Sequence, residues 1–341
     1  MKGKLSFAAL LVVSGLVCSN SWAQQLTEPS ASEEAKSPLI IAHRGASGYA
    51  PEHSAVAVAL AHAQNADYIE QDVVLTRDHV PVVLHDIILD FVTNVKEVYP
   101  DKHRPNGHYY VVDFTFAELQ KLTLTERKSK HGEQRYPQRF SVTSGDFKIM
   151  SLAQQIELIL GLNQTRNTNT GLYIEFKAAR WHKTQNYDVV QATLGVLARY
   201  GFSDVVPPAP IYLQSFDPEV LRRLKREFMT QLPLVQLVAE NSWNESDIDY
   251  NTMLTAAGLE TLSSYAGGVG IWLNHIYLGL DENGQPKFSD VIAHAQAAGL
   301  KVHVYTLRAD DLPEGVTSYQ QLKDWLLELG VDGVFTDFPD L

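Results

Sequence analysis

Two histidines in this sequence stand at the ends of short apolar runs, where a packed strand would end. His43-Arg44 follows a run that begins at Leu39, and His85 ends a run that begins at Val80. A histidine can move a proton near neutral pH, and an arginine can bind two oxygens of a phosphate at once. Each motif is weak alone, because a single histidine is more often a packing residue than a catalyst. Together they predict phosphate chemistry.

Three carboxylates add a metal site to this prediction. Glu70 and Asp72 lie inside an otherwise apolar run, and residues two apart on a strand face the same way, about 6–7 Å apart. Two carboxylates on one buried face are costly without a nearby cation. Glu175, on another apolar run, could complete an oxygen cage for one divalent cation, Ca²⁺ or Mg²⁺ rather than Zn²⁺. Lys177 could contact a phosphate oxygen or simply pair with Glu175.

The elements that would position these residues alternate between strands and helices. The predicted strands span residues 39–43, 68–75, 80–85, 172–177, 211–216, 234–238, 269–273, 301–307 and 333–336. Such alternation predicts parallel βα units, and eight of them fit a TIM (β/α)8 barrel of roughly 250 residues. A doubly wound sheet is the alternative, but no Gly-x-Gly-x-x-Gly turn follows the first strand.

The run 80–85 is one strand too many for this barrel. The connection from Leu75 to Pro81 is too short for a crossover helix, so 80–85 should return antiparallel to 68–75. Pairing Thr76 with Val80 is then expected to place His85 opposite Asp72. Residues 86–150 would form an insertion after this hairpin, a small helical segment that caps one mouth of the barrel.

The N-terminus reads as a targeting signal. Lys2 and Lys4 precede a short apolar run, and small residues lead up to Ala23, which predicts a signal peptide over residues 1–23. A lipid anchor on Cys18, the only cysteine, is the rival interpretation. Residues 24–37 then form a flexible leader and 38–341 the barrel. We expect an exported, periplasmic protein without stable membrane insertion.

The chain is acidic, with a net charge of −12 over 341 residues. Charge alone should therefore not hold a nucleic acid, and a small anionic substrate needs a local cationic site. The sequence leaves the oligomeric state open, with a homodimer among the options.

The motifs together resemble the glycerophosphodiester phosphodiesterase family, from about Leu39 to Pro339, and most closely its periplasmic bacterial branch. The residues that carry the resemblance are His43-Arg44-Gly45-Ala46, Pro51-Glu52-His53-Ser54, Glu70-Gln71-Asp72, Leu84-His85-Asp86, Glu175-Phe176-Lys177, Gln214-Ser215-Phe216, Ser242-Trp243-Asn244-Glu245 and Phe335-Thr336-Asp337-Phe338-Pro339.

The resemblance implies roles for individual residues. Metal ligands would be Glu70, Asp72 and Glu175, with Ca²⁺ preferred to Mg²⁺. His43 and His85 would be the acid/base pair, and Arg44 and Lys177 would bind phosphate. Supporting roles fall to Glu52, Gln214, Phe216 and Trp272, although the match around Trp272 is loose.

The implied reaction is metal-dependent hydrolysis of glycerophosphodiesters, such as glycerophosphocholine or glycerophosphoethanolamine, to glycerol 3-phosphate and an alcohol. Either water or the glycerol 2-hydroxyl could be the first nucleophile, and the sequence does not say which histidine acts first. Two rivals are a barrel phospholipase that acts on intact lipids and a phosphate-ester binding protein without activity. The first should carry a basic amphipathic helix, and the second should lack a histidine or a metal carboxylate.

Overall fold

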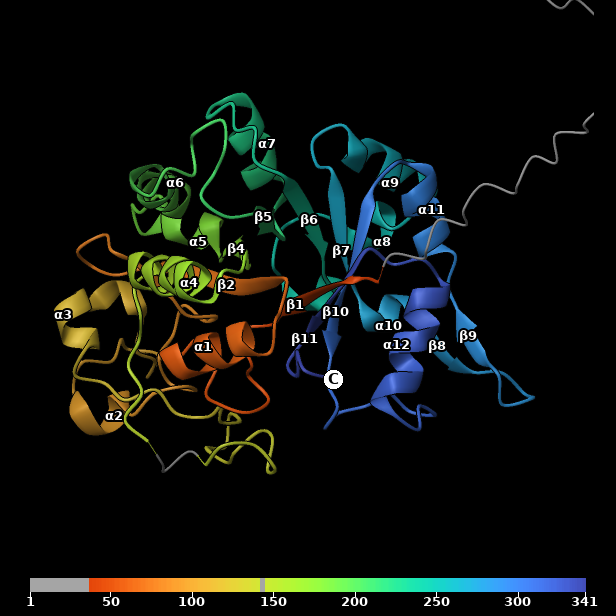
Figure 1. The fold of residues 1–341 in the computed structure, drawn as a ribbon. Coiled ribbons are helices and arrows are strands. Elements are labelled where there is room, and N and C mark those ends of the chain that lie inside the picture. Colours follow the sequence, from red (N-terminus) through yellow and green to blue (C-terminus); the bar gives the residue numbers. More distant parts are fainter. Residues whose placement is uncertain (1–36, 142–144) are drawn as a thin grey trace, which may run out of the picture. The chain divides into compact units, whose positions relative to one another are not determined.

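Eight parallel strands close into a barrel in the computed structural model, which describes residues 37–141 and 145–341. In chain order they are β1 (Leu39–Ala42), β2 (Tyr68–Leu75), β4 (Gly171–Phe176), β5 (Ile211–Ser215), β6 (Leu234–Val238), β7 (Gly268–Trp272), β10 (Lys301–Leu307) and β11 (Gly333–Thr336). The ring closes because β1 pairs with both β2 and β11 (Figure 1). The predicted TIM barrel is confirmed, and the doubly wound alternative is wrong.

Apolar runs form these strands because both faces are covered. In β2, every residue after Tyr68 is buried. Such strands carry apolar residues on successive positions, unlike the strict alternation of a sheet that faces water on one side. Inside the barrel, Ile41, Tyr173, Val235 and Phe335 pack together, so the lumen is a core and the site must lie at an end.

Helices surround the barrel and begin at recognisable caps. Asp217 directly precedes Pro218 at the start of one helix, and its side chain accepts a hydrogen bond from the Glu219 backbone N–H. Ser151 begins another helix with a capping box. The helices outside the insertion are α1 (Ala55–Ala63), α4 (Leu152–Arg166), α5 (Ala179–Thr184), α6 (Val189–Arg199), α7 (Pro218–Arg226), η2 (Asn241–Trp243), α8 (Tyr250–Met253), α9 (Ala256–Ser263), α10 (Leu273–Ile276), α11 (Val291–Ala297) and α12 (Tyr319–Glu328).

The predicted hairpin forms, but one detail of its register was wrong. Strand β3 (Pro81–Val83) runs antiparallel to β2, and the Thr76 N–H donates to the Val80 backbone oxygen, with an N···O distance of 3.1 Å. That pairing puts Leu84 opposite Asp72, and the Leu84 N–H donates to the Asp72 backbone oxygen at 2.9 Å. His85 is therefore not opposite Asp72. It follows the last ladder residue, where the chain is free to turn toward the site.

A second hairpin was not predicted. Strands β8 (Tyr277–Leu280) and β9 (Pro286–Phe288) lie between α10 and α11 and pair antiparallel with each other.

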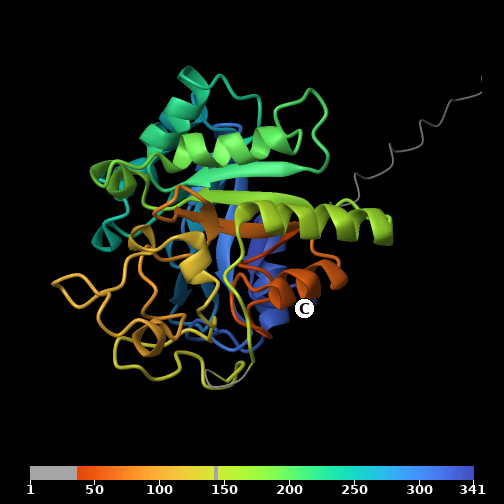
Figure 2. The same ribbon diagram turned by 90° about the vertical axis from the view of Figure 1, so that its left-hand side faces the viewer.

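The insertion between β3 and α4 is a small helical segment, as expected. It contains α2 (Val95–Val98), η1 (Val111–Asp113) and α3 (Phe116–Leu119). Leu89, Phe114 and Leu124 centre its own apolar cluster, which also includes Val82 of β3. In Figures 1 and 2 the insertion, coloured orange to yellow, gathers beside the barrel near α1. Its position lets it contribute side chains to the same barrel end as the hairpin.

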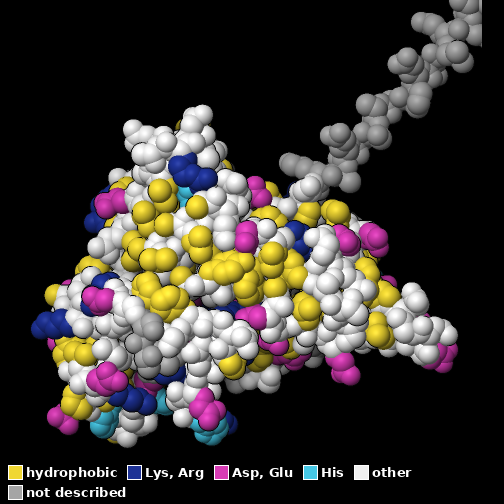
Figure 3. All heavy atoms as spheres, turned by 60° about the horizontal axis from the view of Figure 1, so that its bottom comes forward, with side chains coloured by type: hydrophobic (Ala, Val, Ile, Leu, Met, Phe, Trp, Pro, Cys, Tyr) yellow, Lys and Arg dark blue, Asp and Glu magenta, His cyan; other side chains and the backbone are white. Residues whose placement is uncertain are grey.

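The surface carries acidic side chains in many separate places, as the face in Figure 3 illustrates. This spread fits the net charge of −12. Within the described ranges, no helix is both long enough and apolar enough to cross a membrane.

Candidate active site

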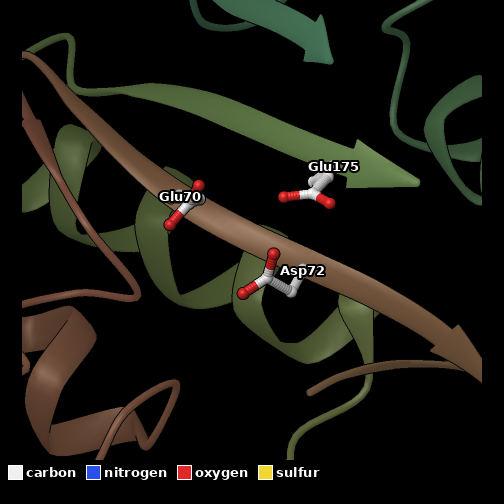
Figure 4. A group of neighbouring side chains, drawn as sticks. All are labelled: Glu70, Asp72 and Glu175. Carbon is white, nitrogen blue, oxygen red and sulfur yellow. The ribbon is translucent and has the colours of Figure 1, made fainter. Parts of the chain in front are cut away.

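Three carboxylates converge on two adjacent strands. Glu70 and Asp72 lie on β2 and Glu175 on β4, and the strand register makes Asp72 and Glu175 direct neighbours. One oxygen of each lies within 4.8 Å of one from each of the others, and all three side chains are buried (Figure 4). The sequence prediction that these three acids share one place agrees with this geometry.

The charge of this group is only partly balanced by the protein. Burial and the neighbouring carboxylates raise the pKa of Glu70 well above its usual range. Burial, with Asp72 nearby, raises the pKa of Glu175 to about 8, although Lys177 Nζ lies 2.7 Å from its oxygen. Burial would also raise the pKa of Asp72, but the hydrogen bond with His53 Nε2, 2.7 Å away, holds it well below its usual range.

These residues fit a hard divalent cation. The donor set is made entirely of carboxylate oxygens, the ligands that Ca²⁺ and Mg²⁺ prefer. Gln214 supports the set, because its Nε2 donates to Glu70 Oε1 at 2.9 Å. The second Glu70 oxygen accepts the Arg44 backbone N–H at 3.1 Å, which ties the acid to the turn after β1.

His43 stands at the end of β1 and is held by a distant aspartate. Its Nδ1 lies 2.6 Å from Asp337 Oδ1, and its Nε2 lies 3.8 Å from Glu70 Oε2. Burial and the Arg44 guanidinium lower the pKa of His43 to about 4. At neutral pH the ring is neutral, and the carboxylate requires the proton on Nδ1. The Nε2 lone pair is then free to accept a proton.

His85 is held in the same way from the hairpin. Its Nδ1 lies 2.7 Å from Asp86 Oδ1, and its Nε2 faces Lys177 Nζ at 3.4 Å. Burial and the charges of Arg44 and Lys177 lower the pKa of His85 to about 3. The two histidines are thus held alike, each with Nδ1 against an aspartate. Both line one cavity of about 580 Å³ together with the three carboxylates.

Arg44 lies between the histidines and the acids. Its backbone is left-handed, with φ +58°, and Gly45 follows at φ +82°. A Cβ on Gly45 would lie 2.7 Å from the Ala57 carbonyl carbon, so the turn requires glycine there. The Arg44 guanidinium pairs with Glu52, with Nη1 3.1 Å from Oε1. Glu52 therefore positions Arg44, and Arg44 lines the cavity.

Lys177 is placed differently from Arg44. It is buried, it pairs with Glu175, and it is not among the residues that line the 580 Å³ cavity. The internal ion pair that the sequence left open is thus present.

Aromatic side chains form another part of the cavity wall. Phe216 and Trp272, both predicted as supporting residues, line it together with Trp243 and Tyr305. The Trp243 and Trp272 rings meet edge to face, 5.0 Å between centroids. Their wall offers apolar contact area beside the charged centre.

Two aspartates with no role assigned from the sequence hold the histidines. Asp337 follows β11 and also accepts hydrogen bonds from Arg139 Nη2 at 2.6 Å and Arg308 Nε at 2.9 Å. Burial opposes ionisation, but Arg308 and His43 hold the pKa of Asp337 well below its usual range. Its signals in the sequence were its place in the closing motif of the family resemblance and its position directly after a predicted strand.

The insertion supplies the support for the second aspartate. Arg127 donates to Asp86 Oδ2 at 2.7 Å and to both oxygens of Glu52 at 2.6 and 2.8 Å. One guanidinium thereby fixes the partner of His85 and the partner of Arg44. No local spacing could have predicted it, because these contacts join residues 41 and 75 positions apart.

Comparisons with known proteins agree on one family. The profile of the Glycerophosphoryl diester phosphodiesterase family matches residues 43–341. The chain is 39% identical over 321 residues to the glycerophosphodiester phosphodiesterase of Haemophilus influenzae, covering 89% of this chain and 88% of that one. It is 34% identical over 325 residues to the enzyme of the same name from Treponema pallidum, covering 89% and 90%.

A solved structure shares the fold. It is an Oleispira antarctica phosphodiesterase in complex with its product sn-glycerol-3-phosphate, with a TM-score of 0.60 and 24% identity over 89% of this chain and 94% of that one.

Proposed function

Because this chain belongs to the glycerophosphoryl diester phosphodiesterase family, a family of phosphoric diester hydrolases, we propose that it releases glycerol 3-phosphate from deacylated phospholipids by metal-dependent, two-histidine catalysis. One observation carries the proposal. Each of two neutral histidines is held through Nδ1 by an aspartate, and both line the cavity that contains three convergent carboxylates. Proton transfer and a metal site are thus available at one place.

The substrates we propose are glycerophosphocholine and glycerophosphoethanolamine. The Oleispira antarctica enzyme binds sn-glycerol-3-phosphate as its product, which supports the same product here. The cavity of about 580 Å³ lies in the ordinary range of roughly 300–1,000 Å³ for small-molecule sites.

Glu70, Asp72 and Glu175 would hold one divalent cation, and we favour Ca²⁺ over Mg²⁺. When bound, such an ion withdraws charge from a phosphoryl oxygen. Ca²⁺ tolerates irregular oxygen cages, whereas Mg²⁺ demands near-octahedral geometry. Arg44 would bind another phosphate oxygen. Lys177, which pairs with Glu175, would contribute positive charge next to the acids. Fixed positive groups of this kind stabilise the charge that builds on the phosphate in the transition state.

Proton transfer is assigned to the two histidines. One neutral histidine accepts the proton of the attacking hydroxyl at Nε2. The other is also neutral in the substrate-free protein, so it must first take up a proton from solvent at Nε2, which it then delivers to the oxygen of the departing alcohol. Asp337 and Asp86 are positioning residues in this scheme. Each carboxylate orients one ring and stabilises the imidazolium that forms during the reaction. The order of the histidines, and water or the 2-hydroxyl as nucleophile, are both compatible with this arrangement.

The location we propose is the periplasm, with the signal peptide cleaved near Ala23. The segment that would direct export lies outside the described residues. Mass spectrometry of the exported protein should find a chain that begins near Gln24, and a lipidated N-terminus at Cys18 would overturn this proposal. A homodimer stays a prediction from the sequence alone.

The activity is tested by measuring the water-soluble products of cleavage, which are glycerol 3-phosphate and choline from the deacylated substrate and choline or phosphocholine from an intact lipid. Glycerophosphocholine and intact phosphatidylcholine are supplied separately to the purified protein. We expect release from the deacylated substrate only. Cleavage of the intact lipid alone would favour the phospholipase rival, and no cleavage of either would favour a binding protein.

A further inference from the structure

A second cavity of about 130 Å³ adjoins the reaction cavity. The two cavities share His43, Arg44, His85, Arg135 and Arg308. The remaining wall of the second cavity comes largely from the insertion and contains none of the aromatic wall residues. A diester whose phosphate lies between the histidines would therefore extend one arm toward this cavity, which we name the arginine cavity.

The arginine cavity is cationic in an acidic chain. Five arginines line it, against only three acids. Two of these acids are already shared, because Glu52 pairs with Arg44 and Arg127, and Asp337 pairs with Arg139 and Arg308. The third acid is Glu126, a buried residue whose pKa burial raises to about 7. Two further acids lie behind the wall, because Asp86 pairs with Arg127 and Asp310 pairs with Arg139, so the positive charge left in excess at this place is that of Arg135.

Arg135 is the arginine in this cavity with the freest charge. Its side chain is exposed, and within residues 37–141 and 145–341 no carboxylate forms an ion pair with it. Its backbone is nevertheless fixed, because the Arg135 N–H donates to the Arg127 oxygen at 2.9 Å next to a bridge between Lys128 and Gln134. A guanidinium held at a cavity mouth without a carboxylate is suited to an anion that arrives with the substrate.

We propose that the arginine cavity receives the headgroup and that Arg135 binds a negatively charged group on it, a phosphate or a carboxylate. The inference rests on the proposed function. The volume of about 130 Å³, against about 580 Å³ for the reaction cavity, suits one such group rather than a long chain. Headgroups with their own negative charge are thus the preferred class of substrate, ahead of neutral and cationic headgroups.

Two matched pairs of substrates test this preference. Glycerophosphoglycerol phosphate differs from glycerophosphoglycerol by one phosphate, and glycerophosphoserine differs from glycerophosphoethanolamine by one carboxylate. The measured quantity is the ratio of kcat/KM within each pair, for the native protein and for Arg135→Gln. The matched control is Arg226→Gln, which removes the same charge from an exposed position on α7.

We expect the native ratio to favour the charged member of at least one pair. Arg135→Gln should lower that ratio by about tenfold, the usual effect of losing one hydrogen bond between charged groups, and Arg226→Gln should not change it. The pair that responds identifies the anion. Melting temperatures of both variants should match the native protein, since neither side chain has an ion pair to lose within the part of the chain that the structure describes.

Ratios near one in both pairs, or ratios that Arg135→Gln leaves unchanged, would overturn the inference while glycerol 3-phosphate release upheld the proposed function. A preference for the cationic glycerophosphocholine over all four substrates would also overturn it. Release from none of the substrates would overturn the proposed function, and the inference with it.

Discussion

Asp337→Asn isolates the contact that positions His43. Asn is nearly the same size as Asp, so the change keeps the shape of a residue that is 1% exposed. It replaces a carboxylate that lies 2.6 Å from His43 Nδ1 with a neutral amide. The amide can donate to Nδ1, which would move the ring proton to Nε2, the atom that must be free to accept a proton.

The size of the effect follows from this contact. A hydrogen bond to a charged group contributes about 1.5–3 kcal/mol, which is roughly 10- to 150-fold in rate. Loss of a positioned acid or base altogether usually costs about 10²–10⁴-fold. We therefore expect kcat to fall by about 10²-fold, with a smaller change in KM, because Asp337 does not line the 580 Å³ cavity and in the arginine cavity its carboxylate is already paired with Arg139 and Arg308.

The assay is steady-state glycerol 3-phosphate release, with Asp310→Asn as the matched control. Asp310 also pairs with Arg139, at 2.8 and 3.0 Å, but it has no contact with either histidine among the described residues. The control should keep kcat within about threefold of the native value, the small effect typical of a partly exposed ion pair. If Asp337→Asn also kept kcat within that range, with an unchanged melting temperature, the positioning role would be refuted.

Three further predictions concern the pair of histidines, the acids and the insertion. His43→Ala and His85→Ala should each lower kcat by at least about 10²-fold, and the double variant should lose less than the product of the two, since residues that act as one unit are non-additive. Glu175→Gln should weaken Ca²⁺ binding, measured by calorimetry, by about tenfold or more while the fold persists. Glu118→Gln should lower stability by roughly 1 kcal/mol at neutral pH, because it removes the carboxylate charge that pairs with Lys102 and Arg77, while glutamine can still close the capping box of α3 as Gln154 does in α4. The hydrogen bond with Lys102 and the cap lower the pKa of Glu118 to about 2, so this loss should be present above about pH 4.5 and vanish as the pH falls toward 2.

Controls on exposed helix positions make these results specific. His294→Ala on α11 should leave kcat unchanged, and Glu260→Gln on α9 should leave Ca²⁺ binding unchanged. Near-normal turnover of His85→Ala would contradict two-histidine catalysis. Unchanged Ca²⁺ affinity of Glu175→Gln would remove that residue from the site. A Glu118→Gln penalty that stayed constant down to pH 2 would mean that the carboxylate charge contributes nothing.

The strands of the barrel could be predicted because each is a compact apolar run with a local signal. Tyr68–Leu75 and Lys301–Leu307 were predicted with the bounds that the structure gives them. The same local rule placed Glu70 and Asp72 on one face. The hairpin between β8 and β9 escaped prediction because its strands are only four and three residues long, and the leucines of β8, Leu278 and Leu280, are exposed rather than part of a buried run.

The support of the site could not be predicted, because it depends on contacts between distant parts of the chain. Asp337 meets His43 across 294 positions, and Arg139 meets Asp337 across 198. Arg127 and Arg139 come from the insertion, where no strand or helix period indicates the direction of a side chain. The position of His85 was misjudged by one residue, because counting from the predicted Thr76–Val80 pair places Leu84 opposite Asp72, and one residue in an antiparallel ladder turns a side chain to the other face.

The most direct test of the central claim is the metal dependence of glycerol 3-phosphate release from glycerophosphocholine. The protein is stripped with chelator, its metal content is measured, and Ca²⁺ or Mg²⁺ is then returned. We predict that release falls by at least about 10²-fold in the stripped protein and recovers fully with Ca²⁺ and less with Mg²⁺. Full release by a protein shown to be free of metal would contradict metal-dependent hydrolysis.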